Sequence, residues 1–184
     1  MNLMEMILNA QNGDVVRQMA NNFQLDEGQA KSAMGALIPA LTRGISKEAS
    51  SSQGLNDLIG ALGRGNHSQY IDNPAALGQR VAVEEGNGIL GHIFGSKEVS
   101  REVASRAAQS TGVDSGILKQ MLPMLASLAM GALSKSGFGS GSTPNQLSGG
   151  QDAGIASMLT SFLDADKDGS AMDDILGLAS RFLR

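Results

Sequence analysis

The chain of 184 residues is 41% hydrophobic and 17% charged, a composition typical of a folded protein that can bury a core. Its net charge of −4 and aromatic content of 3% argue against nucleic-acid binding, which needs basic side chains and stacking rings. The absence of cysteine excludes disulfides, thiolate zinc sites and cysteine nucleophiles.

Apolar residues spaced three and four apart predict an all-α fold, and no stretch alternates as a strand would. The first helices are expected at residues 3–10 and 14–22, separated by the turn dipeptide Asn12-Gly13. A long helix should then begin at Asp26, which can form a capping box with Gln29 three residues later.

The middle of the chain is divided by two glycine-containing polar stretches. Residues 63–74 (GRGNHSQYIDNP) predict a loop, and residues 84–88 (EEGNG) predict the end of a helix. Ser96 and Asp114 are placed to cap the next two helices. The helices expected after residue 50 are 54–62, 74–83, 89–94, 97–110 and 115–134.

Two stretches resemble each other, residues 15–45 and residues 99–133. Each has a short amphipathic helix, an apolar-Asp-x-Gly cap (LDEG and VDSG), and a long helix that contains proline (LIPAL and MLPML). A proline inside a helix removes a hydrogen bond and favours a kink, although each proline could also stand in the first turn of a separate helix. We expect two similar helical subunits, about 15–62 and 86–133, packed into one core around the proline-containing helices.

Composition divides the chain into a helical body (1–136), a Gly/Ser-rich linker (137–150) and a short helical tail (151–184). The longest strongly apolar run, 121–133, has 13 residues, fewer than the roughly 20 that span a bilayer. The N-terminal stretch has no basic segment before its apolar residues, so it does not resemble a signal peptide. We expect a cytoplasmic protein with no membrane insertion.

The second repeat carries a family resemblance. The segment ILGHIFGSKEVSREVASRAAQSTGVD, followed by LKQMLPMLASLAMGAL, resembles the YidB-like bacterial proteins, a domain of unknown function. The match is good over residues 86–133 and weaker over 15–62, and the ending LDADKDGSAMDDILGLASRFL is similar to a tail that many of these proteins carry. The resemblance implies a multihelical fold with a buried central helix, and it implies no catalytic residues.

The tail contains a candidate calcium loop between two expected helices. In an EF-hand loop, oxygen ligands occupy positions 1, 3 and 5, glycine occupies position 6, and a backbone carbonyl comes from position 7. Ile175 stands at position 12, where a bidentate glutamate belongs. The candidate metal ligands are Asp164, Asp166, Asp168 and Ser170, with Asp173 and Asp174 as substitutes for the missing glutamate.

The same loop has a simpler explanation as a capped turn. Ser170 and Asp173 fit a capping box, and aspartate and glycine are common turn residues. Three alternating aspartates nevertheless exceed what a cap requires, and their mutual repulsion favours a bound cation. We therefore expect weak calcium binding, nearer the class with dissociation constants of about 10⁻⁴–10⁻³ M than the sensor class.

The remaining polar residues indicate no further chemistry. His67 is expected in a polar loop and His92 packed in an apolar helix, and two histidines without cysteine or a local carboxylate cluster do not predict a zinc site. Glu84 and Glu85 have no partner acid at a readable spacing.

We therefore expect a non-enzymatic interaction or scaffold protein that binds a protein partner or forms a homo-oligomer. The alternative is a small-ligand-binding protein or enzyme whose site is assembled from scattered residues. A deep pocket with converging titratable groups would support that alternative.

Overall fold

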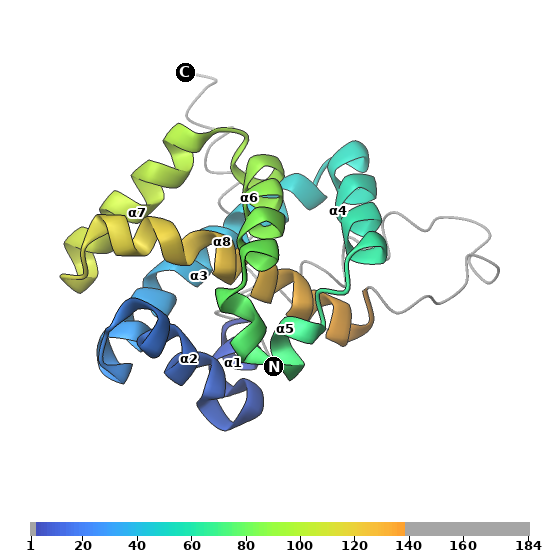
Figure 1. Ribbon diagram of the computed structural model, residues 1–184. Coiled ribbons are helices and arrows are strands. Elements are labelled where there is room, and N and C mark those ends of the chain that lie inside the picture. The colour runs from blue at the N-terminus through green and yellow to red at the C-terminus, as the bar shows by residue number, and fades with distance from the viewer. Residues whose placement is uncertain (1–2, 139–184) are drawn as a thin grey trace, which may run out of the picture.

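The computed structural model describes residues 3–138, and this part of the chain is all-helical (Figure 1). Most of the expected linker and the whole expected tail, with its calcium loop, lie outside the described residues. In chain order the elements are α1 (Leu3–Asn9), the 3-10 helix η1 (Ala10–Gly13), α2 (Asp14–Phe23), α3 (Glu27–Ala49), α4 (Ser52–Arg64), α5 (Gln69–Asp72), the 3-10 helix η2 (Pro74–Gly78), α6 (Arg80–Phe94), α7 (Lys97–Thr111), α8 (Ser115–Leu133) and the π-helix η3 (Ser134–Phe138).

The three helix starts with predicted caps are confirmed. At α3, the Gln29 amide donates to Asp26 Oδ1 at 2.7 Å, and the Asp26 amide donates to Gln29 Oε1 at 3.2 Å, which completes the capping box. At α7, the Val99 amide donates to Ser96 Oγ at 3.3 Å. At α8, Asp114 Oδ1 accepts from the Gly116 amide at 2.8 Å and from a second amide one residue later.

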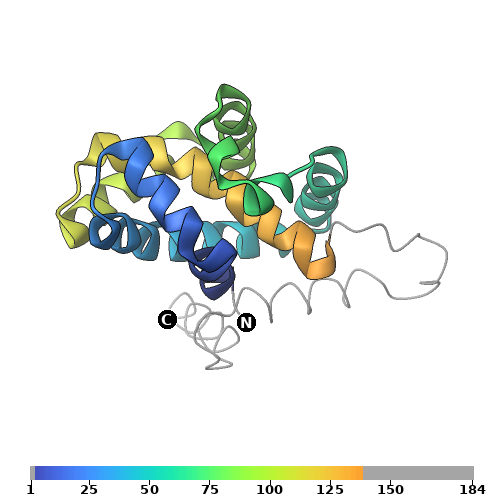
Figure 2. The same ribbon diagram turned by 60° about the horizontal axis from the view of Figure 1, so that its bottom comes forward.

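Helix α8 is the centre of the fold. Every residue from 121 to 133 is buried, and the helix packs against α1, α3, α5, α6 and α7 (Figures 1 and 2). Within the described residues, Ser115–Ser136 is the one stretch long and apolar enough to cross a membrane, but 78% of its apolar window is buried inside the fold. The apolar character of this helix is thus accounted for by its central position.

The two stretches that resemble each other in sequence each form a pair of consecutive helices. In both, a shorter helix (α2 or α7) is followed by a long one (α3 or α8) that begins at an aspartate cap and contains a proline. Pro39 and Pro123 lie inside α3 and α8, so the alternative that they stand at a first turn is wrong. The arrangement of these pairs as two equivalent subunits stays a prediction.

One predicted break is wrong, and one predicted loop is only partly right. Residues 84–88 do not end a helix, because α6 runs continuously from Arg80 to Phe94. Gly86 is the point of closest approach to α8, and packing there offsets the cost of a glycine inside a helix. The expected loop at 63–74 contains the short helix α5, which buries Tyr70 and Ile71 against α8.

Candidate functional site

A cavity of about 300 Å³ opens between α4 and α6, and we call it the His67 pocket. Apolar groups form much of its wall, with Leu58 and Ala61 on α4, Ile89 on α6 and the fully buried Met130 on α8. Titratable side chains from four segments complete it: Glu48 from α3, Asp57 from α4, His67 from the α4–α5 connection, and Glu85 and His92 from α6. An apolar pocket with a few converging polar groups is the usual form of a small-molecule site.

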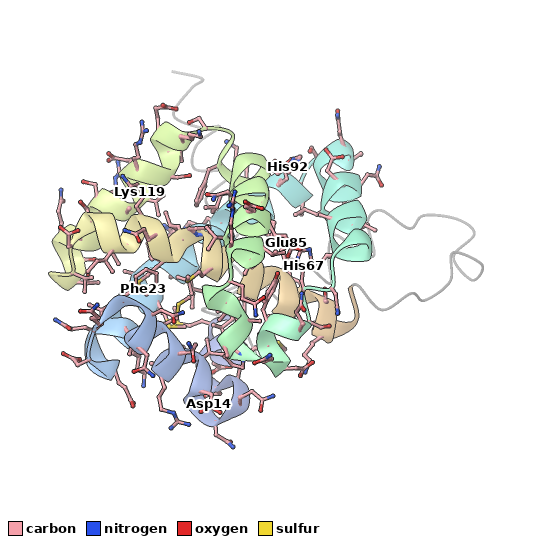
Figure 3. All side chains as sticks on the ribbon, viewed as in Figure 1. Asp14, Phe23, His67, Glu85, His92 and Lys119 are labelled. Carbon is pink, nitrogen blue, oxygen red and sulfur yellow. The ribbon has the colours of Figure 1, made fainter. Side chains whose placement is uncertain are left out.

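Helix α6 presents one continuous face to the pocket. Glu85, Gly88, Ile89 and His92 recur at helical spacing, so they lie on the same side of the helix. Figure 3 shows Glu85 and His92 on the side of α6 that is nearer α4, with His67 beside Glu85. Helix α4 packs on α3 and η3, and the pocket lies between α4 and α6.

Two glycines make room for His67. Its side chain is buried, with the residue only 5% exposed. A Cβ atom on Gly65 would lie 2.0 Å from His67 Nε2, and a Cβ on Gly131 of α8 would lie 2.5 Å from the His67 carbonyl oxygen. Because a larger residue would collide with the imidazole at Gly65 and with the His67 backbone at Gly131, these glycines allow His67 to be buried there.

Tyr70 and Glu85 join the short helix α5 to the pocket wall. The Tyr70 hydroxyl donates a hydrogen bond of 2.7 Å to Glu85 Oε2, and Tyr70 is 1% exposed. Burial of the phenol, reinforced by the hydrogen bond to the Glu85 carboxylate, raises the pKa of Tyr70 to about 12. Tyr70 therefore stays protonated at neutral pH and fixes one oxygen of the Glu85 carboxylate.

The imidazole of His67 has an unused polar atom. His67 Nδ1 lies 3.5 Å from Glu85 Oε2, which is close enough for an ion-pair contact. The direction of that contact does not suit a hydrogen bond, and Nδ1 has no hydrogen-bond partner among the described residues. A buried polar atom without a partner costs about 1–3 kcal/mol, so it marks a place where a partner would be favourable.

The pocket residues do not form a metal centre. Among residues 3–138, no group of three or more His, Asp or Glu side chains could hold a metal ion. The carboxylates of Glu48, Asp57 and Glu85 instead stand on three different helices around one cavity.

The model of a family described as a bacterial protein of unknown function (DUF937) matches residues 5–136. The chain belongs to this family. The matched region covers most of α1 and all of α2 to α8, and so includes every residue of the His67 pocket. YidB is a member of the same family, which confirms the resemblance found in the second repeat. No curated protein and no solved structure matches the chain.

In this DUF937 chain, the sequence patterns placed the pocket residues incorrectly. His67 was expected in a polar loop and is in the connection between α4 and α5, but it is buried. His92 lies in a helix as expected, but it is exposed at the pocket rather than packed. Glu85 was expected at a helix end but lies inside α6, where it meets Tyr70 from fifteen positions earlier. The predicted calcium ligands, 164–174, lie outside the described residues.

A second hollow of the DUF937 domain is a groove of about 630 Å³ between α3 and α7. Its apolar wall includes Pro39 and the exposed Val99, and three basic residues line it: Arg43, Lys47 and Arg106. Arg106 already donates to Glu102 at 2.7 Å. Because Pro39 has no N–H, the Gly35 carbonyl in the same groove lacks its usual helical partner.

Proposed function

We propose that this chain is a non-enzymatic binding protein whose His67 pocket takes a small ligand. The observation that carries the proposal is the His67 imidazole, which is 5% exposed, lines the cavity and has an unpaired Nδ1 atom. Burying such an atom without a partner destabilises the folded state, and a ligand that forms a hydrogen bond with it offsets that cost.

Three features of the pocket favour binding over catalysis. The described side chains that line it include no Ser, Thr, Cys or Lys that could act as a nucleophile. The Glu85 carboxylate is not hydrogen-bonded to the imidazole, so the pair lacks the orientation that activates a histidine base. Tyr70, with its raised pKa, is buried behind Glu85 and holds that carboxylate in place.

The proposal is tested by filling the pocket from a position that leaves the fold intact. Gly88 lines the pocket, and a Cβ atom there would meet nothing within 4 Å. Gly91 lies on the same helix, has equally open space and does not line the pocket, so it provides a matched control.

A library of small soluble compounds is titrated into ¹⁵N-labelled protein, and amide shifts are recorded. We expect compounds that shift Gly65, Gly88 and Ile89 together, and we expect Gly88→Leu to abolish these shifts while Gly91→Leu retains them. A library that shifts no pocket amide, or shifts that survive Gly88→Leu, would contradict the proposal.

A second candidate function is protein interaction through the α3–α7 groove, and its specific support is the exposed apolar Val99. Val99 is 43% exposed in a groove that basic side chains also line, and the Gly35 carbonyl, which lacks its usual helical donor at Pro39, adds an acceptor to the same surface. The combination suits an amphipathic helix with acidic flanks, contributed by another protein or by a second copy of this chain.

Sedimentation over a range of protein concentrations tests whether the second copy is the partner. We expect the mass to increase with concentration and Val99→Asp to remove the increase. Val81→Asp is the control, because Val81 is 56% exposed on α6 and does not line the groove. A constant monomer mass would rule out self-association.

A further inference from the structure

We infer that the His67 pocket is specific for a small organic cation, an ammonium group carried on a short apolar body. This inference rests on the proposed ligand-binding function and adds the chemical class of the ligand. It follows from the charge of the pocket, from its unpaired acceptor and from the chemistry of its walls.

The described side chains that line the pocket carry charge of one sign only. Glu48, Asp57 and Glu85 are carboxylates, and no Lys or Arg is among the described side chains that line the pocket. The three acids stand on α3, α4 and α6, so the tertiary structure, rather than one acidic segment, brings them together. A concave, partly apolar cavity lined by charges of one sign concentrates the electric field and attracts the opposite charge.

The unpaired atom of His67 offers a place for a donor group of the ligand. In the tautomer protonated at Nε2, the Nδ1 atom is an acceptor, and it lies 3.5 Å from a carboxylate oxygen that is an acceptor too. A ligand group with several N–H donors can form hydrogen bonds with both acceptors at once. An ammonium group has three such donors and no acceptor, and its bonds to carboxylates are charge-assisted.

The rest of the pocket suits the apolar body of such a ligand. Leu58, Ala61, Ile89 and Met130 offer aliphatic and thioether surface, and the cavity of about 300 Å³ is at the small end of ligand sites. The pocket contains no described phenylalanine, tyrosine or tryptophan ring. Recognition of the cation therefore depends on the carboxylates rather than on an aromatic cage.

Three probes of equal length separate the charge from the apolar body: n-hexylammonium, 1-hexanol and hexanoate. Each is titrated into the ¹⁵N-labelled full chain at neutral pH, and the shifts of Gly65, Gly88 and Ile89 give the affinity. We expect n-hexylammonium to bind about tenfold or more tightly than 1-hexanol, and hexanoate to bind least, because one charge-assisted contact corresponds to roughly a tenfold change.

Charge-neutralising variants then identify the responsible groups. Glu85→Gln and Glu48→Gln should each weaken the binding of n-hexylammonium several-fold and leave the binding of 1-hexanol unchanged. The control Glu102→Gln, on the outer face of α7, should change neither affinity. Added salt should weaken the binding of n-hexylammonium but not that of 1-hexanol, because salt screens only the attraction between charges.

Each outcome has a defined meaning. Equal binding of n-hexylammonium and 1-hexanol at the pocket, or tighter binding of hexanoate, would overturn the cation specificity and leave the pocket as a ligand site. If none of the three probes, and no compound of the broader library, shifts the pocket amides, then both the specificity and the proposed binding function are wrong.

Discussion

Gly86 of α6 lies directly against the backbone of Pro123 of α8. A Cβ atom on Gly86 would stand 1.9 Å from the Pro123 carbonyl oxygen, far inside the contact distance of two atoms. Two residues that usually disfavour a helix interior thus meet where the central helix crosses its neighbour. Glycine is required here by close approach of two backbones rather than by an unusual backbone angle.

The first prediction compares two alanine substitutions on α6. Gly86→Ala should lower the free energy of unfolding by about 1–3 kcal/mol, because the added methyl group forces α6 and α8 apart. Gly91→Ala should leave stability unchanged or raise it by up to about 1 kcal/mol, because its Cβ meets nothing and alanine favours the helix. Urea denaturation measures both values, and equal effects would show that the close approach is absent in solution.

The second prediction concerns the stability of the fold in alkali. An exposed tyrosine ionises near pH 10, whereas the pKa of Tyr70 is raised to about 12 in the folded protein. Between these values the unfolded chain releases a proton that the folded chain keeps, so the free energy of unfolding should fall with pH, by about 2–3 kcal/mol in total. Below pH 10 this contribution is fully present.

Tyr70→Phe isolates that effect from other groups that titrate in alkali. The variant should lose about 1 kcal/mol at pH 7, where Glu85 is left without its phenol donor but is partly exposed to water. It should also lose the component of the pH dependence that lies between pH 10 and 12. The measurement is urea denaturation of both proteins at pH 7, 9.5 and 11.5, and parallel curves would show that Tyr70 ionises normally.

The third prediction concerns the two aspartate caps in the stretches that resemble each other in sequence. Asp26→Ala and Asp114→Ala should each destabilise the protein by about 1 kcal/mol, because each removes an acceptor for amides at the start of a long helix. Asn at either position should restore most of the loss. Thermal unfolding of the four variants checks this, and a cost confined to one cap would show that the two helix starts are not energetically equivalent.

The fourth prediction concerns the tail that the sequence assigns to calcium. Calorimetric titration of the metal-stripped full chain should give saturable heat with a dissociation constant of about 10⁻⁴–10⁻³ M. The double substitution Asp164→Ala and Asp166→Ala should remove this heat, since both side chains are expected ligands. No heat up to millimolar calcium would make the segment 164–170 a capped turn.

The helices themselves were largely predictable, because local chemistry determines them. The N-caps of α3, α7 and α8 are the residues predicted from their capping side chains, Asp26, Ser96 and Asp114. The apolar run at 121–133 forms most of the buried central helix. Prediction failed at Gly86, where local preference for a break was overridden by packing. The sequence shows a glycine there but does not show the Pro123 carbonyl that makes the glycine necessary.

The candidate site was not predictable, because its residues come from separate helices. His67, Tyr70 and Glu85 share no periodic pattern, and the spacing of fifteen positions between Tyr70 and Glu85 spans a short helix, a 3-10 turn and part of α6. Gly65 and Gly131 carried a partial signal, but a glycine near a histidine indicates a close contact only once the partner backbone is known.

By itself, the sequence determined an all-α, cysteine-free protein with capped long helices and an apolar central helix, because caps and hydrophobic periodicity act over a few neighbouring residues. Only the tertiary structure decided that a histidine from a polar segment is buried, that three carboxylates surround one cavity, and that α4 stands apart from α6. These features depend on which helices pack together and how closely their backbones approach, and distant side chains settle that packing through the volume they fill.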